Sequence, residues 1–203
     1  MQTAFCAPNP DSCGGTGGCA GATAEIAFDY LAGSSGLFQE YQQGYTGYNG
    51  QNGQCGTPAG GAKGSISGFV KLAENNYTAL MNAIATVGPV AISVDANWGS
   101  YESGVFSGCD PTKNVDIDHA VVLVGYGVDN GQKYWLVRNS WSPSWGEKGY
   151  IRVARSDDDE NNCATDSTPQ DGTACSGETA PVKVCGTCGI LYDSSYPTGA
   201  TAF

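Results

Sequence analysis

Two β-branched apolar runs separated by a short turn constrain the fold of this chain more than any other feature. The runs are "HAVVLVGYG" (119–127) and "QKYWLVRNS" (132–140), and Asn130-Gly131 between them is a strong hairpin-turn signal. Runs of this composition form strands. "PVAISVDA" (89–96) and "GYIRVAR" (149–155) are predicted as further strands. We therefore expect an antiparallel sheet in this part of the chain.

Helical patterns come earlier. "TAEIAFDYLAG" predicts a helix over 23–33, with Thr23 as its N-cap and Gly33 at its end. "YTALMNAIATVG" predicts a second helix over 77–88. The order of these patterns predicts an α+β chain, with a helical part at 1–62 and a β-rich part at 63–203.

One segment of the β-rich part differs in composition from the rest. Residues 157–187 are acidic, rich in Pro, Gly, Ser and Thr, and contain cysteines. We interpret them as a disulfide-tied surface excursion outside the core.

The composition excludes some classes of function. The net charge is −11 over 203 residues, and a nucleic-acid partner would require clustered Lys and Arg. No segment approaches the length of a membrane span.

Nine cysteines in a chain of this size favour an oxidising compartment, and the number is odd. At least one cysteine is therefore expected to be free or paired outside this chain. The first residues lack the basic start and apolar middle of a secretory signal. We therefore expect a further segment upstream of Met1.

The single histidine, His119, stands at the start of a predicted strand. An imidazole that acts as a general base needs a partner that fixes its tautomer, and the Asn139 amide lies at the end of the paired strand. The Trp141 indole can shield the resulting hydrogen bond from water. The alternative is an ordinary buried histidine, with Asn139 and Trp141 as turn and packing residues.

Several segments, in order along the chain, resemble the papain-like cysteine peptidases. They are "GCAGATAEIAFDYL", "GPVAISVDA", "YESGVFSGC", "DHAVVLVGYG", "YWLVRNSWSPSWGEKGYIRV" and "CGILYDSSYP". The resemblance implies a two-lobe fold, here an incomplete helical lobe followed by an antiparallel β-sheet lobe. It implies peptide-bond hydrolysis, with His119 as the catalytic imidazole, Asn139 as its orienter and Trp141 as the shield.

The family's nucleophile lies in a Cys-Gly-Ser/Ala-Cys-Trp-like motif well before the position of Cys19, with a glutamine upstream of it. Residues 1–18 contain neither. We therefore expect a C-terminal part that is inactive alone, with the nucleophile on an upstream segment or a companion chain. The alternative is a non-catalytic binding or scaffold protein with a papain fold.

The resemblance also implies a set of substrate-binding residues. Gly21 and Ala22 would bind the substrate backbone, and Ile117 with Asp118 would line the pocket for the second residue before the scissile bond. Asp193 would lie at the floor of that pocket and accept Arg or Lys through a charge-assisted pair. The alternative for Asp193 is a solvated loop residue.

The same resemblance implies two disulfides, Cys6–Cys55 and Cys109–Cys188. It leaves Cys19 unpaired here, because its usual partner lies beside the nucleophile, although Cys13 is an alternative partner. The lysosome, the vacuole or the extracellular space is the expected location.

Asn76 begins an N-glycosylation sequon, Asn76-Tyr77-Thr78. No metal or cofactor is expected. The Cys-x-x-Cys at 185–188 has no second pair for a structural zinc site, and "SDDDENNC" lacks the alternating ligands and central glycine of a calcium loop.

Overall fold

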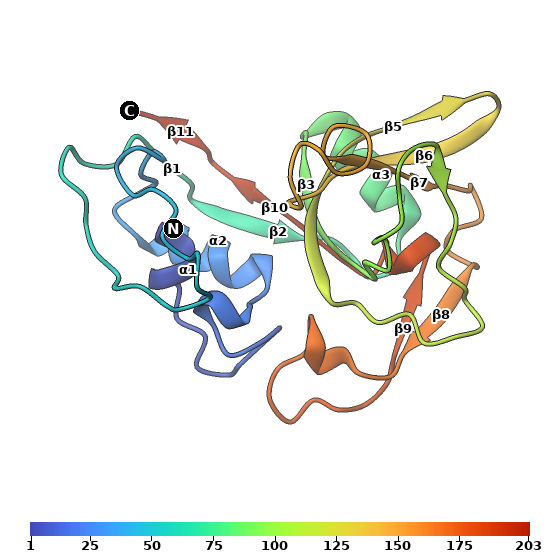
Figure 1. Ribbon diagram of the computed structural model, residues 1–203, viewed down its shortest axis with the longest axis horizontal. Helices are drawn as coiled ribbons and strands as arrows, with labels where there is room; N and C mark the ends of the chain where they lie inside the picture. Colours follow the sequence, from blue (N-terminus) through green and yellow to red (C-terminus); the bar gives the residue numbers. More distant parts are fainter.

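The computed structural model describes all 203 residues, which form two lobes joined by a pair of strands (Figure 1). The helical lobe contains α1 (Gln2–Cys6), the 3-10 turn η1 (Gly18–Ala20) and α2 (Ala24–Gly33). The β-rich lobe contains the central sheet, α3 (Tyr77–Thr86) and a smaller hairpin. The chain is therefore α+β, with few helices.

The central sheet has seven strands, in the order β2-β10-β3-β5-β6-β7-β4. Their bounds are β2 Gly68–Lys71, β3 Val90–Val94, β4 Val105–Phe106, β5 His119–Asp129, β6 Gln132–Arg138, β7 Tyr150–Ala154 and β10 Asp193–Thr198.

All neighbours in this sheet are antiparallel except β4 and β7, which pair in parallel. The expectation of a purely antiparallel sheet is thus wrong at one edge. A parallel pair needs a long connection between its strands, and the β5–β6 hairpin lies within the connection from β4 to β7.

The predicted hairpin is present, with Asp129 opposite Gln132 in the β5–β6 ladder. Asn130 and Gly131 have φ values of 48° and 81°, the left-handed region that a two-residue type I′ turn requires. The turn and a register shift between Leu123 and Gly125 together set the pairing that places the two strand ends, at residues 119 and 139, near each other.

The main core lies between this sheet and the elements that cover it. Large, fully buried side chains contributed by the sheet include Leu123, Trp135 and Ile151, while Leu80 on α3 packs against them and Trp98 lies beside the end of β3. Burial of large apolar side chains is the main stabilising contribution to such a fold.

The two predicted helices differ from expectation at their caps. Thr23 stands at the N-cap position of α2, but its side chain makes no capping hydrogen bond. Its methyl group instead lies close to Gly14. In α3 the cap is Asn76, whose side chain accepts a hydrogen bond from the Ala79 amide, and the helix ends at Thr86, before the expected Gly88.

The excursion at 157–187 contains β8 (Cys163–Asp166) and β9 (Val182–Cys185), which pair antiparallel, and the 3-10 turn η2 (Pro169–Asp171). A third 3-10 turn, η3 (Thr187–Gly189), follows. Val184 and Cys185 are fully buried. The prediction that this segment lies wholly outside the core is therefore wrong, because β9 packs beneath the loop that leads into β5.

The final residues return to the helical lobe. β11 (Thr201–Ala202) pairs with β1 (Gly64–Ser65), and Leu37 bridges to Gly64. Figure 1 shows β2 and β10 running side by side from the β-rich lobe to this pair. The helical lobe thus includes the C-terminus, which a division into 1–62 and 63–203 does not describe. None of the helices has the length and apolar character needed to cross a bilayer.

Candidate functional site

His119 and Asn139 lie at adjacent strand ends and contact each other directly. His119 begins β5, and Asn139 follows the last residue of β6. The His119 Nε2 and Asn139 Oδ1 atoms are 2.8 Å apart, within hydrogen-bonding distance. The register of one hairpin therefore builds this pair.

The Asn139 carboxamide is nearly buried, and its oxygen also accepts a hydrogen bond from the Ser140 amide at 2.7 Å. Because this oxygen can only accept, the imidazole nitrogen that faces it, Nε2, carries the proton. In the neutral ring Nδ1 is then the basic nitrogen, and it makes no hydrogen bond within the chain.

Indole rings surround the pair. The Trp141 ring lies 5.2 Å from the imidazole, centroid to centroid, and the Trp98 ring lies 6.3 Å away. Trp145 stacks on Trp98 and contacts Trp141 edge-on. Trp98 is fully buried, whereas Trp141 is 38% exposed. The aromatic cluster therefore packs against the imidazole and is partly exposed to solvent at Trp141.

Sequence reasoning identified Trp141 but missed Trp98 and Trp145. The spacing Trp-x-x-x-Trp at 141–145 was an available signal for Trp145. Nothing local marks Trp98, because it enters the cluster from the loop after β3.

The residues just before His119 are held in different ways. Asp118 is exposed, and its carboxylate accepts a hydrogen bond from the Ala96 amide at 3.2 Å. Ile117 is fully buried in a small cluster with Val115 and Val184. Ile117 therefore does not line an open pocket, in contrast to the expectation, because β9 covers its side chain and Gly172 lies against its backbone.

Gly21 and Ala22 follow η1 on the helical lobe. Gly21 is exposed and has a φ of 94°, a conformation that glycine adopts readily. Its carbonyl accepts a hydrogen bond from the Gly17 amide at 2.8 Å, and Ala22 is half-buried. The expected contact of Gly21 and Ala22 with substrate stays a prediction.

Asp193 is the first residue of β10 and is almost fully buried, so the alternative of a solvated loop residue is wrong. The carboxylate accepts a hydrogen bond from the Ser93 hydroxyl at 2.7 Å and pairs with the Lys71 ammonium at 3.0 Å. A basic substrate side chain would therefore have to displace Lys71. The expected role of Asp193 in a substrate pocket stays a prediction.

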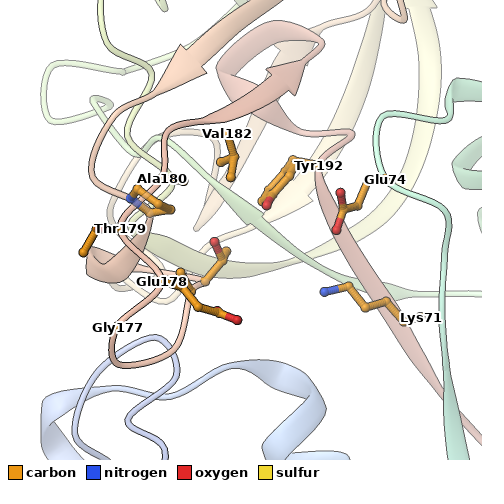
Figure 2. Close-up of a pocket in the computed structure, with 11 residues that line it drawn as sticks. Lys71, Glu74, Gly177, Glu178, Thr179, Ala180, Val182 and Tyr192 are labelled. Atoms are coloured by element: carbon orange, nitrogen blue, oxygen red, sulfur yellow. The ribbon is translucent and has the colours of Figure 1, made fainter.

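A cavity of about 570 Å³ is lined by Lys71, the ion-pair partner of Asp193, and by Tyr192, the residue before it (Figure 2). The Lys71 ammonium, the Glu74 and Glu178 carboxylates and the Tyr192 ring all point into the opening, and Val182 lies behind them. Residues 177–180 form its outer wall. Because Lys71 already pairs with Asp193, the cavity mouth is acidic.

Several carboxyl groups lie near the residues that precede His119. Burial raises the pKa of Asp116 and of Asp166 above the ordinary value. Asp166 is fully buried and accepts hydrogen bonds from the amides of Ile117 and Thr168, which oppose the increase. Burial also raises the pKa of Asp95, which is half-buried directly after β3.

The structure contains four disulfides. The predicted Cys6–Cys55 and Cys109–Cys188 bridges are confirmed, and Cys163–Cys185 ties β8 to β9. The fourth bridge is Cys13–Cys175. Cys19 is exposed and unpaired, as predicted, so the alternative Cys13–Cys19 pair is wrong. No three His, Cys, Asp or Glu side chains are grouped as metal ligands.

Comparison with known proteins gives a consistent result. The model of the family described as papain family cysteine protease matches residues 5–172. Digestive cysteine proteinase 2 of Homarus americanus is 36% identical over 154 residues, which are 73% of this chain and 45% of that protein. Cathepsin L of Sarcophaga peregrina is 36% identical over 160 residues, 76% of this chain and 45% of that protein.

Among solved structures, the digestive procathepsin L2 proteinase from Tenebrio molitor larval midgut superposes with a TM-score of 0.71 at 32% identity. The match covers 97% of this chain and 51% of that structure. The chain therefore has a papain-like fold and spans about half the length of these relatives.

Proposed function

Because the chain belongs to the papain family of cysteine proteases, we propose that it supplies the histidine–asparagine half of a cysteine peptidase site that hydrolyses polypeptides. The observation that carries the proposal is the 2.8 Å contact between His119 Nε2 and Asn139 Oδ1 beneath Trp141. This contact leaves Nδ1 of the imidazole free to exchange a proton with a thiol.

In the proposed reaction a cysteine thiol outside residues 1–203 gives its proton to Nδ1 of His119. The thiolate attacks the carbonyl carbon of the scissile peptide bond. The imidazolium then returns the proton to the leaving amine as the C–N bond breaks, and an acyl-enzyme thioester forms. Water attacks the thioester with His119 again as base, which releases the acid and regenerates the thiol.

Asn139 acts in this scheme as a positioning residue. It fixes the tautomer and ring plane of the imidazole and transfers no proton. The aromatic cluster excludes water from the hydrogen bond, which strengthens it in a site of low local dielectric.

The site is proposed to work in the lysosome or vacuole or outside the cell. Four disulfides support an oxidising compartment, and the similarity to a cathepsin L and to a digestive proteinase supports the same assignment.

The test is alkylation of the native gene product with iodoacetamide, followed by peptide mapping. We expect loss of peptidase activity to parallel alkylation of one cysteine that is not among the nine of this chain. The same treatment of a His119→Ala variant should alkylate that cysteine much more slowly, because the thiolate loses its imidazole partner. Loss of activity that parallels alkylation of Cys19, or full activity after complete alkylation, would contradict the proposal.

A further inference from the structure

Residues 169–178, here called the strap, leave the β-rich lobe between β8 and β9 and reach the helical lobe (Figure 1, orange). The Cys13–Cys175 disulfide ties the strap to that lobe. Two backbone hydrogen bonds reinforce the tie. The Gly14 amide donates to the Ala174 carbonyl at 3.0 Å, and the Ser176 amide donates to the Asp11 carbonyl at 2.8 Å.

The strap is a compact turn. The amides of Thr173 and Ala174 both donate to the Pro169 carbonyl, at 3.0 and 2.8 Å. The Glu178 carboxylate accepts a hydrogen bond from the Cys175 amide at 2.8 Å. Because these bonds fix its shape, little conformational entropy remains to be lost when the strap docks.

Glycines on both sides let the strap fit closely between the lobes. A methyl group on Gly172 would overlap the carbonyl oxygen of Ile117 and lie 3.0 Å from Asp118 Cα. A methyl group on Gly14 would lie 2.5 Å from the Gly172 carbonyl oxygen. Gly14 in turn lies against Gly21, since a methyl group on Gly21 would be 2.7 Å from the Gly14 oxygen. The strap backbone therefore fills the space between residues 117–118 and the loop beside Gly21.

We infer that the strap occupies the half of the cleft that receives the residues preceding the scissile bond, and that the Cys13–Cys175 disulfide holds it there. The inference rests on the proposed function, because the resemblance to the family assigns Ile117–Asp118 and Gly21–Ala22 to the two sides of that half. Peptides extended on the amino side of the scissile bond are therefore excluded while the disulfide is intact. A substrate with a single residue before that bond does not need the space.

Competition explains why the disulfide matters. A tethered segment competes with a substrate at an effective concentration on the order of millimolar, and the bridge keeps the strap next to its seat whenever it lifts. Without the bridge only the short hydrogen bonds and the packing of Gly172 oppose an entering peptide.

The kinetic test uses the native gene product, at a reductant concentration at which mass spectrometry shows Cys13–Cys175 to be intact. Two substrates are compared, an N-acetylated tetrapeptide amide and an unblocked amino-acid amide with the same leaving group. In the Cys13→Ser/Cys175→Ser variant we expect kcat/KM for the tetrapeptide to rise by about tenfold or more. The kcat/KM for the amino-acid amide should stay unchanged.

Gly172→Ala gives an independent version of the test, because the added methyl group lifts the strap and leaves the disulfide in place. Thr179→Ala, an exposed change just beyond the strap, is the matched control and should behave as the unmodified protein. Equal changes for both substrates, or no change for either in an active enzyme, would overturn the inference.

A second measurement is independent of peptidase activity and so separates this inference from the proposed function. Hydrogen–deuterium exchange is followed on the native gene product, at the Gly14 and Ser176 amides that bond across the two lobes. Gly172→Ala should accelerate both by about tenfold or more, and Thr179→Ala should not. Unchanged exchange in Gly172→Ala would show that Gly172 does not seat the strap and would overturn the inference, whatever the kinetics.

Discussion

At the scale of single residues, the Asn139 carboxamide decides which nitrogen of His119 carries the proton. Its oxygen faces Nε2, and the Ser140 amide holds that oxygen in place. The ring is therefore set in one tautomer before any substrate arrives. Preorganisation of this kind separates a group that positions from a group that transfers a proton.

That division predicts unequal losses of activity. In the native gene product, His119→Ala should lower kcat by about 10²- to 10⁴-fold, the usual contribution of a general acid–base. Asn139→Ala should lower it less, by about tenfold to a hundredfold, because the imidazole remains but is no longer aligned. Asn49→Ala, an exposed amide on the helical lobe, is the control. Equal losses from the first two variants would contradict the division.

The ion pair at Asp193 gives a prediction about stability. Lys71→Met leaves the nearly buried carboxylate with only the Ser93 hydroxyl as partner. We expect the free energy of unfolding to fall by about 1–3 kcal/mol in urea denaturation. Lys113→Met breaks an exposed pair with Asp110 and should change it by less than about 0.5 kcal/mol. Similar values for the two variants would show that the Lys71 pair contributes only as a surface salt bridge.

At the scale of elements, Asn76 has two separable roles, as the cap of α3 and as the first residue of a sequon. Asn76→Ala should cost about 1 kcal/mol of unfolding free energy through loss of the Ala79 hydrogen bond. Asn76→Asp keeps a capping oxygen, and Thr78→Ala leaves the cap untouched.

All three variants should lose the glycan mass when the protein passes through a secretory pathway, but only Asn76→Ala should lose stability by that amount. Thermal unfolding and mass spectrometry of the same samples separate the two roles. If the mass of Thr78→Ala differed from that of the unmodified protein only by the side-chain change, with no loss of a glycan, the sequon would not be used.

What the sequence could predict at this scale depends on how local each feature is. The proximity of His119 and Asn139 could be predicted from the hairpin pattern, but their placement on one face also depends on the register shift between Leu123 and Gly125, which no local pattern marked. Thr23 has the right residue type for a cap but makes no capping hydrogen bond, and its methyl group lies close to Gly14, a neighbour that no local pattern reveals. The parallel pairing of β4 likewise depends on the path of the whole chain.

Resemblance to the family extended the prediction to Cys6–Cys55 and Cys109–Cys188 but was a poor guide to Ile117. The β9 strand and Gly172, both in the excursion at 157–187, cover that residue. The Cys13–Cys175 bridge joins residues 162 apart in sequence, and the resemblance to the family did not imply it. The features that the resemblance failed to predict, the burial of Ile117 and the Cys13–Cys175 bridge, are those in which this chain departs from the expected family pattern.

At the scale of the whole molecule, the charge distribution predicts how stability depends on pH. Burial raises the pKa of the fully buried Asp166 and of Asp159. A carboxyl with a raised pKa stabilises the native state below about pH 4, and this contribution is lost as pH rises through the folded-state pKa. The net charge of −11 adds repulsion between carboxylates, which also lowers the stability of the native state as pH rises. Hydrogen bonding to Arg152 lowers the pKa of Glu147, whose contribution is lost only as pH falls below its ordinary range.

We therefore expect a larger unfolding free energy at about pH 5 than at pH 7.5, measured by urea denaturation at both values. Asp159→Asn should reduce that difference, because the amide does not titrate. The exposed neighbour Asp158→Asn should leave it nearly unchanged. Greater stability at pH 7.5 than at pH 5 would contradict the prediction.

The bridge from Cys13 to Cys175 also makes most of the polypeptide a covalently closed ring. A single proteolytic cut at any bond between these two cysteines opens the chain but releases no fragment, because the pieces stay linked through sulfur. The molecule can thus be nicked during maturation or in a protease-rich fluid and still migrate as one particle until a reductant reaches it.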